Sequence, residues 1–246
     1  MYHAANIIDE VQDGEIKPDS DIQQPGIAIP ASLSLIFAAF QTLNNSTPEE
    51  GVRNPVIELF TQAGFLSSLG QYRLTIQSHS HAENQDPLEN QWSNLILKSG
   101  SIYRAGVAGG AVVGSGTGAQ IEGLGDYGVA VGVIRQVIDD CCDIWVDTLG
   151  KTRKTTLPLL LYKLVSDQLL EQEEISEPGF GLSSFQASED TSKLLVDAGI
   201  PEMIAEILLE WRRRAVGSLD VLDPSPVKNI LVDIIGHILN PNTSVS

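Results

Sequence analysis

The sequence predicts an all-α fold. Long aliphatic segments alternate with short polar turns, which favours helices over the strands of a sheet. One apolar segment, Tyr127 to Trp145, has no proline and only two glycines, so we expect a buried helix there. With 246 residues the chain can bury one sizeable core, and a single domain over residues 1–246 is the simplest organisation.

The composition excludes some partners and indicates a compartment. A formal charge of -17 argues against nucleic acid, whose phosphates bind basic surfaces. No membrane span is expected, because the apolar runs are judged shorter than the roughly 18 uncharged residues that a span needs. No basic segment followed by an apolar one opens the chain, so no signal peptide is predicted. The adjacent Cys141 and Cys142 are not expected to pair, which favours the cytoplasm.

In the first half of the chain, polar loops separate the predicted helices. Residues 1–13 have helical spacing from the start, and a polar loop with prolines nearby follows at residues 19–26. A second polar loop is expected at residues 78–87. The other helices of this half are expected at residues 28–43, 53–77 and 88–108.

The second half opens with five glycines between residues 109 and 118. No strand precedes them and no Gly-Lys-Ser/Thr follows, so they predict a turn between helices and not a nucleotide-binding loop. Proline is tolerated where helices begin, as at Pro158 and Pro201. Residues 171–190 mix acids and serines with proline and glycine, which predicts a mobile surface segment. Helices are expected at residues 127–145 and 156–170, from Pro201 onward, and at residues 227–239.

Three aspartates lie near the end of the predicted 127–145 helix. Asp139 and Asp143 are four residues apart and share one face, with Asp140 one step round the helix. Carboxylates gathered on one edge repel each other unless a positive charge compensates, and their oxygens suit Mg2+. A solvated acidic helix end is the alternative for these residues alone. Their flanks favour the metal: Gln136 precedes them, and Gly150-Lys151 and Lys154-Thr155-Thr156-Leu157-Pro158 follow.

This ordered set resembles the second aspartate-rich motif of the isoprenyl diphosphate synthases, the trans-polyprenyl synthetase family. The spacing between its two lysine elements is shorter here than in the family. The resemblance covers most of the chain and implies the all-α isoprenoid synthase bundle around a central cavity.

Near the start of the chain, Asp9, Glu10 and Asp13 repeat the same register. They resemble the family's first aspartate-rich motif, with Glu10 where a second aspartate is usual. An exposed acidic helix end is the alternative for these residues alone. The arginine pair that usually follows this motif is absent, and so are upstream helices that bind isopentenyl diphosphate in the family. A truncated gene product and a paralogue without that second substrate site both stay open.

Two further matches are short. Gly70-Gln71 resembles a Gly-Gln pair that the family places on the helix facing the metals, with plain helix surface as the alternative for Gln71. Lys98-Ser99 resembles the family's Lys-Thr, whose lysine reaches the allylic diphosphate. The alternative is that Lys98 extends its long side chain from the helix into solvent. Ala5 and Ala4 lie one turn before Asp9, where small residues leave the floor of the product cavity open in the family.

The resemblance implies a Mg2+-dependent prenyltransferase that condenses an allylic diphosphate with isopentenyl diphosphate, with a product of geranylgeranyl length, acting as a homodimer or heterodimer. A catalytically weak partner subunit of a full-length synthase and, further off, a class I terpene synthase are the alternatives. The implied roles are metal ligation by Asp9, Glu10, Asp13, Asp139, Asp140 and Asp143, catalysis and diphosphate binding by Lys98, Gln136, Lys151 and Lys154, and substrate binding by Gln71, Ala4 and Ala5.

Overall fold

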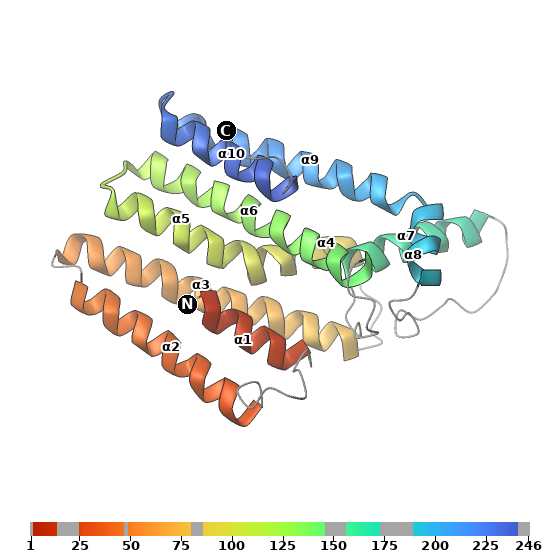
Figure 1. Ribbon diagram of the computed structural model, residues 1–246, viewed down its shortest axis with the longest axis horizontal. Coiled ribbons are helices and arrows are strands. Elements are labelled where there is room, and N and C mark those ends of the chain that lie inside the picture. Colours follow the sequence, from red (N-terminus) through yellow and green to blue (C-terminus); the bar gives the residue numbers. More distant parts are fainter. Residues whose placement is uncertain are drawn as a thin grey trace. The chain divides into compact units, whose positions relative to one another are not determined.

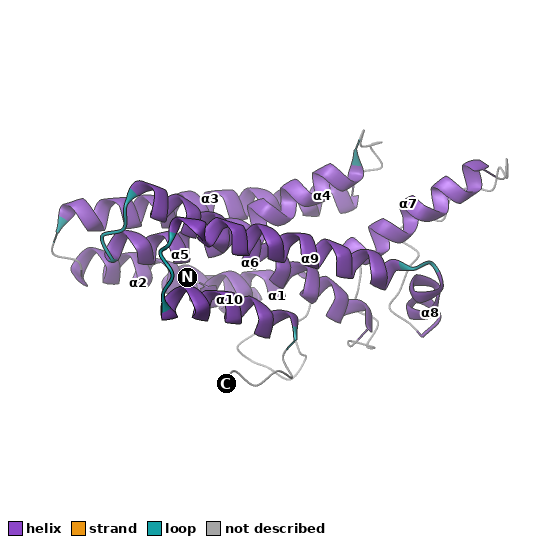
Figure 2. Ribbon diagram, turned by 90° about the horizontal axis from the view of Figure 1, so that it is seen from above, coloured by secondary structure: helices purple, strands orange, loops and turns teal. Residues whose placement is uncertain are grey.

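The protein is all-α in the residues that its structure, a computed structural model, describes. These are residues 2–13, 25–46, 49–79, 86–145, 156–172 and 189–240. Every regular element within these ranges is a helix, and none of them forms a strand (Figure 2). The predicted fold class is therefore confirmed. The chain divides into two compact units, Met1–Leu59 and Phe60–Ser246, which are described separately; the single domain expected from the sequence stays a prediction.

The first unit is built on a pair of helices. It contains α1 (Tyr2–Asp13), α2 (Pro25–Ser46) and the first part of α3 (Glu50–His79). Within this unit α1 packs against α2. Small residues are fully or almost fully buried there, Ala4 on α1 and Ala28 and Ser32 on α2, so the two helices have side chains that allow a close approach.

Helix α2 corrects the expectation about membrane spans. From Gly26 to Ser46 it carries no charged residue, and it is long and apolar enough to cross a membrane by length and composition. The expected helix ended at its last aliphatic residue, Leu43, whereas the helix extends over uncharged polar residues to Ser46. The expectation that every uncharged run falls short of roughly 18 residues was therefore wrong. Core helices of soluble proteins and signal sequences meet the same criterion, so α2 alone does not indicate a span.

The second unit is organised around α6. This helix packs against α5, α7, α8 and α9 and against two short turns, η2 and η4. Figure 1 shows α5 and α6 running side by side, with α9 along the same helix. Besides the rest of α3, the unit contains α4 (Pro87–Leu95), the π-helical turn η2 (Ile96–Gly100), α5 (Ser101–Val113), α6 (Gly118–Trp145), α7 (Leu157–Gln172), α8 (Glu189–Asp197), α9 (Ile200–Ser218), the 3-10 turn η4 (Leu219–Val221) and α10 (Pro226–Leu239).

Most helices agree with the predicted ranges to within a few residues. Helix α6 begins at Gly118, nine residues before the predicted start at Tyr127, and three further differences are found. The segment predicted at residues 88–108 is one helical run that contains the π turn η2. The glycine-rich turn is shorter than expected, because α5 continues to Val113. Helix α8 was not predicted, and residues 173–188 of the segment expected to be mobile lie outside the described residues.

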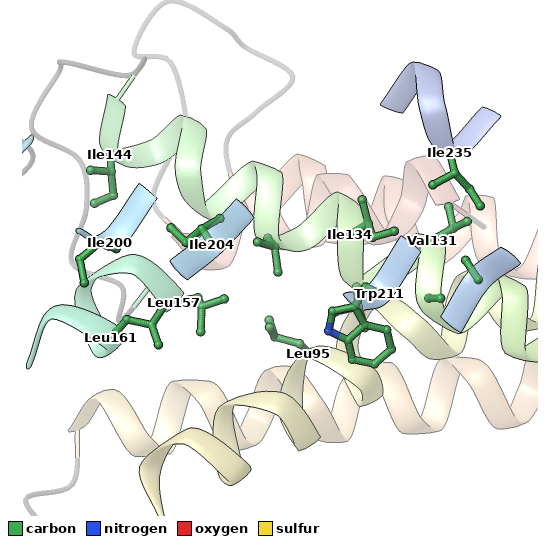
Figure 3. Packing of buried hydrophobic residues seen from close by; sticks show 14 of the residues in the cluster. Leu95, Val131, Ile134, Ile144, Leu157, Leu161, Ile200, Ile204, Trp211 and Ile235 are labelled. Carbon is green, nitrogen blue, oxygen red and sulfur yellow. The ribbon is translucent and has the colours of Figure 1, made fainter. Parts of the chain in front are cut away.

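The core of the second unit lies between α6 and its neighbours (Figure 3). A fully buried aliphatic side chain contributes about 1.5–3 kcal/mol relative to an exposed one, so this cluster is the main source of the unit's stability. Trp211 of α9 meets Trp92 of α4 with ring centroids 6.2 Å apart. The labelled members of the cluster are Leu95, Val131, Ile134, Ile144, Leu157, Leu161, Ile200, Ile204, Trp211 and Ile235.

Glycines on α6 bring its backbone against the preceding helical run. A Cβ atom on Gly128 would lie 2.6 Å from the carbonyl oxygen of Tyr103, and one on Gly132 would lie 2.8 Å from that of Ser99. Real Cβ atoms do not approach backbone atoms so closely, so a larger residue would push the helices apart. This contact sets Ser99 beside α6, about two turns before Asp139.

Candidate functional site

The end of α6 separates its three aspartates by exposure. Asp139 is exposed and Asp143 is half-buried, whereas Asp140 keeps only 6% of its surface accessible. The difference follows from the helix itself, because residues i and i+4 share a face and residue i+1 points about 100° away. The edge with Asp139 and Asp143 is therefore accessible to a ligand, and Asp140 enters the core.

Hydrogen bonds connect Asp140 to two other segments. Its Oδ2 accepts from the backbone N–H of Leu157 at 2.8 Å, and its Oδ1 accepts from Gln136 Nε2 at 3.1 Å. Gln136 Oε1 in turn accepts from Ser99 Oγ at 2.7 Å. The Gln136 amide also donates to Asp139 Oδ2 at 3.5 Å. The network therefore joins η2, α6 and the first residue of α7.

The pKa of Asp140 reflects this buried position. Burial raises the pKa of its carboxyl to about 6, while the hydrogen bonds from Leu157 and Gln136 act in the opposite direction. The negative charge of Asp139 raises the pKa further, and the positive charge of Lys98 lowers it. Lys98 is therefore within electrostatic range of the second acidic motif, as a diphosphate-binding lysine of that site needs to be.

Lys98 is held by the π turn η2 and by α3. A π turn bonds five residues back, as Ser101 N does to Ile96 O, and such turns occur frequently at functional sites. The backbone carbonyl of Lys98 accepts from Ser67 Oγ at 2.7 Å. A Cβ on Gly70 would lie 2.6 Å from Lys98 N, so only glycine lets α3 pack directly on this turn.

Gln71 follows Gly70 on the same part of α3. Its side chain is half-buried, and its Oε1 is buried without a hydrogen-bond partner among the described residues. A buried amide oxygen without a donor is unfavourable by about 1–3 kcal/mol, so a water or ligand donor would stabilise it. The Gly70-Gln71 pair therefore combines a close helix contact with an oxygen suited to receive a donor.

The first acidic motif lies on α1. Asp9 and Glu10 are half-buried, and Asp13 is the last residue of the helix, with its side chain outside the described part. One turn earlier, Ala4 is fully buried and Ala5 is half-buried. That the two acidic motifs face each other across one cavity stays a prediction.

The structure places four of the predicted residues together. Lys98, Gln136, Asp139 and Asp140 share one connected environment. Lys151 and Lys154 lie outside the described residues. Two groups of this network were not predicted from the sequence, the Ser99 hydroxyl and the backbone N–H of Leu157. Ser99 entered the prediction only as the residue after Lys98. No sequence signal marks a backbone donor, whereas the Lys-Ser pair could have directed attention to the hydroxyl.

The carboxylates at the end of α6 are too few to enclose a metal ion by themselves but are enough for Mg2+. Within the described ranges, no group of three or more His, Cys, Asp or Glu side chains is arranged to hold a metal ion. Mg2+ usually takes only one or two carboxylates and completes its shell with waters and substrate phosphates. Asp139 and Asp143, on one accessible edge, match that requirement. The residues present therefore fit a metal that binds together with a phosphorylated substrate.

Comparison with solved structures agrees with this fold. The geranylgeranyl pyrophosphate synthetase of Pyrococcus horikoshii superposes with a TM-score of 0.80 at 20% identity, over 97% of this chain and 76% of that one. The similarity extends over the helical units described above and confirms the isoprenoid synthase class of fold.

Sequence comparison then gives the family. The profile of the polyprenyl synthetase family matches residues 21–173, and the chain belongs to that family. The geranylgeranyl diphosphate synthase of Methanosarcina mazei is 24% identical over 156 residues, which are 62% of this chain and 48% of that protein. The geranylgeranyl pyrophosphate synthase of Geoglobus acetivorans is 25% identical over 223 residues, 86% of this chain and 66% of that protein. The chain thus spans about half to two thirds of the length of these two relatives.

Proposed function

We propose that the chain is a Mg2+-dependent trans-prenyltransferase that condenses an allylic diphosphate with isopentenyl diphosphate. The allylic carbon–oxygen bond breaks, the resulting cation alkylates the double bond of isopentenyl diphosphate, and loss of a proton leaves a chain longer by one isoprene unit. The observation that carries the proposal is the accessible Asp139–Asp143 edge beside Gln136, within range of the Lys98 charge, on a polyprenyl synthetase fold. A product of geranylgeranyl length is supported by the names of the relatives.

The residues have distinct tasks in this reaction. Asp139 and Asp143 would hold the metal at the end of α6, and Asp9, Glu10 and Asp13 would supply the second set of carboxylates. When bound, Mg2+ neutralises the charge that develops on the departing diphosphate. Lys98, with Lys151 and Lys154, binds the diphosphate oxygens, and such contacts accelerate the reaction because they strengthen as the charge grows.

Gln136 and Gln71 orient the site. Gln136 holds the Asp139 carboxylate at 3.5 Å while its oxygen is fixed by Ser99. The buried oxygen of Gln71 would accept a hydrogen bond from a water of the metal shell or from substrate. Side-chain amides suit this task because they donate and accept without adding charge to an acidic site.

We further propose that the protein acts as a homodimer or heterodimer in the cytoplasm. The two free thiols, Cys141 and Cys142, agree with a reducing compartment. The alternative, a partner subunit without strong activity of its own, is favoured by Glu10 in the first motif. It predicts metal and diphosphate binding without elongation.

The first test measures binding. Mg2+ with pyrophosphate at millimolar concentration is expected to raise the melting temperature, because a ligand of the native state adds stability by mass action. Asp139→Ala should abolish the shift and Lys154→Ala should weaken it, whereas Glu206→Ala, an exposed acid on α9, should leave it unchanged. Absence of any shift in the wild type would refute the proposed function.

The second test measures the reaction. The protein is incubated with isopentenyl diphosphate, farnesyl diphosphate and Mg2+, and the dephosphorylated products are separated by length. Elongation to the geranylgeranyl chain supports the proposal. A thermal shift without elongation supports the partner-subunit alternative and rejects the enzyme.

A further inference from the structure

Asp140 is more deeply buried than the two aspartates beside it, and both of its oxygens accept hydrogen bonds. One oxygen accepts from the Leu157 N–H and the other from the Gln136 amide, at 2.8 and 3.1 Å. Both donors come from the protein, and the residue is 6% exposed. A ligand of Mg2+ has to present an oxygen to an ion that keeps several waters, which requires an accessible carboxylate. The contacts of Asp140 are those of a residue that connects helices.

The direction of the hydrogen bonds explains why an acceptor is required at this position. Ser99 donates to the oxygen of Gln136, so the nitrogen of Gln136 must donate onward, to Asp140. From the other side, the Leu157 N–H has no acceptor in the preceding turn of its own helix, because Leu157 is the first residue of α7. A carboxylate satisfies both donors at once, which no neutral side chain of similar size does in the same orientation.

We infer that Asp140 is a positioning residue and not a metal ligand. It fixes the first turn of α7 against α6 and, through Gln136, the orientation of the Asp139 carboxylate. This replaces the expectation, drawn from the sequence, that all three aspartates hold the metal. The inference rests on the proposed function for the role of Asp139, but the connection between α6 and α7 stands on the hydrogen bonds alone.

Two substitutions separate the two roles. Asp140→Asn removes the charge but keeps an oxygen for the Leu157 N–H. Its amide nitrogen can donate to Gln136 if that amide turns over and donates to the Ser99 hydroxyl, at the loss of only the long 3.5 Å hydrogen bond to Asp139. Asp140→Ala removes both acceptors. A positioning residue tolerates the first change and not the second. If Asp140 were a metal ligand, both substitutions would remove the charge that binds the ion, as Asp139→Asn and Asp139→Ala do.

The first measurement is amide exchange of the metal-free protein at Leu157. We expect Asp140→Asn to retain the protection of this N–H and Asp140→Ala to lose it, with a melting temperature lower by roughly 2–8 °C in the alanine variant. Equal protection of Leu157 in the wild type and Asp140→Ala would overturn the connection between the helices. This measurement does not depend on activity, so it decides the structural role even if the wild type binds no pyrophosphate.

The second measurement is the Mg2+ concentration that gives half of the thermal shift with pyrophosphate. We expect Asp140→Asn to stay within about threefold of the wild type, and Asp140→Ala and Asp139→Asn to be raised by roughly 10–100-fold. A midpoint raised as far in Asp140→Asn as in Asp139→Asn, with Leu157 still protected, would show that the charge of Asp140 binds the metal and would overturn the inference. No response of the wild type to Mg2+ and pyrophosphate would instead refute the proposed function.

Discussion

The helices α6 and α1 carry acidic motifs in the same register, but the protein holds them differently. Helix α6 is packed on several sides, by α5, α7, α8 and α9, and one of its acids is buried within a hydrogen-bond network. Within its own unit α1 packs against α2, and Asp9 and Glu10 on it are half-buried. An equal spacing of acids therefore does not imply an equal environment, because the surroundings decide which carboxylate is accessible.

This difference bears on how each motif tolerates change. At the second motif, Asp140 cannot gain or lose a methylene without disturbing its contacts to Leu157 and Gln136. At the first motif the chain carries Glu10, one methylene longer than the usual aspartate, on a half-buried position. We infer that the second motif supplies the rigid part of the site.

The largest effect is expected from neutralising one acid of each motif. Asp139→Asn should lower turnover about 1000-fold, since metal binding supplies several kcal/mol of transition-state stabilisation. Asp9→Asn should have a similar but smaller effect. If both motifs hold one metal cluster, the loss of turnover in the double variant is smaller than the product of the losses in the two single variants. The reason is that each single variant already weakens the same metal site. Turnover is measured at saturating substrate. An Asp9→Asn variant with full activity would exclude the first motif from the site.

The second effect concerns the close packing of α6. Gly128→Ala should destabilise the protein by about 3 kcal/mol, because the added Cβ would lie 2.6 Å from a carbonyl oxygen of α5. The controls are Gly106→Ala on α5 and Gly51→Ala in the first unit, where a Cβ meets nothing within 4 Å. Both should be neutral or stabilising by up to about 1 kcal/mol. Denaturant unfolding measures all three, and equal stabilities would contradict the rigid packing of α6.

A smaller effect is expected in the first half of α6, where Tyr127 connects it to α10. Its hydroxyl donates to the carbonyl oxygen of Leu231 at 2.7 Å, so Tyr127→Phe should reduce the free energy of unfolding by about 1 kcal/mol. Burial raises the pKa of Tyr127 to about 12, above the usual value of 10.0.

The raised pKa also gives this prediction a pH dependence with a definite sign. Between about pH 10 and 12 the unfolded chain loses the Tyr127 proton while the native protein keeps it, so stability falls as the pH rises. The fall should be shallower in Tyr127→Phe than in the wild type, as unfolding at a series of pH values would show. Parallel curves would mean that the hydroxyl is not held as the structure indicates.

The smallest effect is a change in product length at α1. Ala5 is half-buried one turn before Asp9, and Ala5→Phe should shorten the main product by one isoprene unit if the chain runs past this turn. Ala4 is fully buried, so Ala4→Phe would disturb the helix itself and is the poorer test. Asn6→Phe, at an exposed position, is the matched control and should leave the product unchanged. An unchanged product in Ala5→Phe would show that another helix sets the length.

The sequence by itself determined the helices and the family. Helical periodicity and prolines at helix starts are local properties of neighbouring residues, so the ranges of α7 and α10 and the end of α6 followed from them. The order of the second acidic motif is likewise a property of the sequence alone: Gln136, Asp139, Asp140 and Asp143, with the lysines that follow. This order indicated the polyprenyl synthetase family, which the profile match confirms.

Only the tertiary structure decided burial and partners. The uncharged helix α2 carries exposed Ile29 and Phe37, whereas α6, which includes two glutamines, a glutamate, an arginine and four aspartates, buries residues along its length, Tyr127, Ile134 and Asp140 among them. That Asp140 enters the core, that Gly128 contacts a backbone and that Leu157 donates to α6 all depend on residues distant in the chain. Hydropathy measures how apolar a segment is, but the elements that pack against the segment determine which of its residues are buried. They therefore also determine which aspartate is accessible to a ligand.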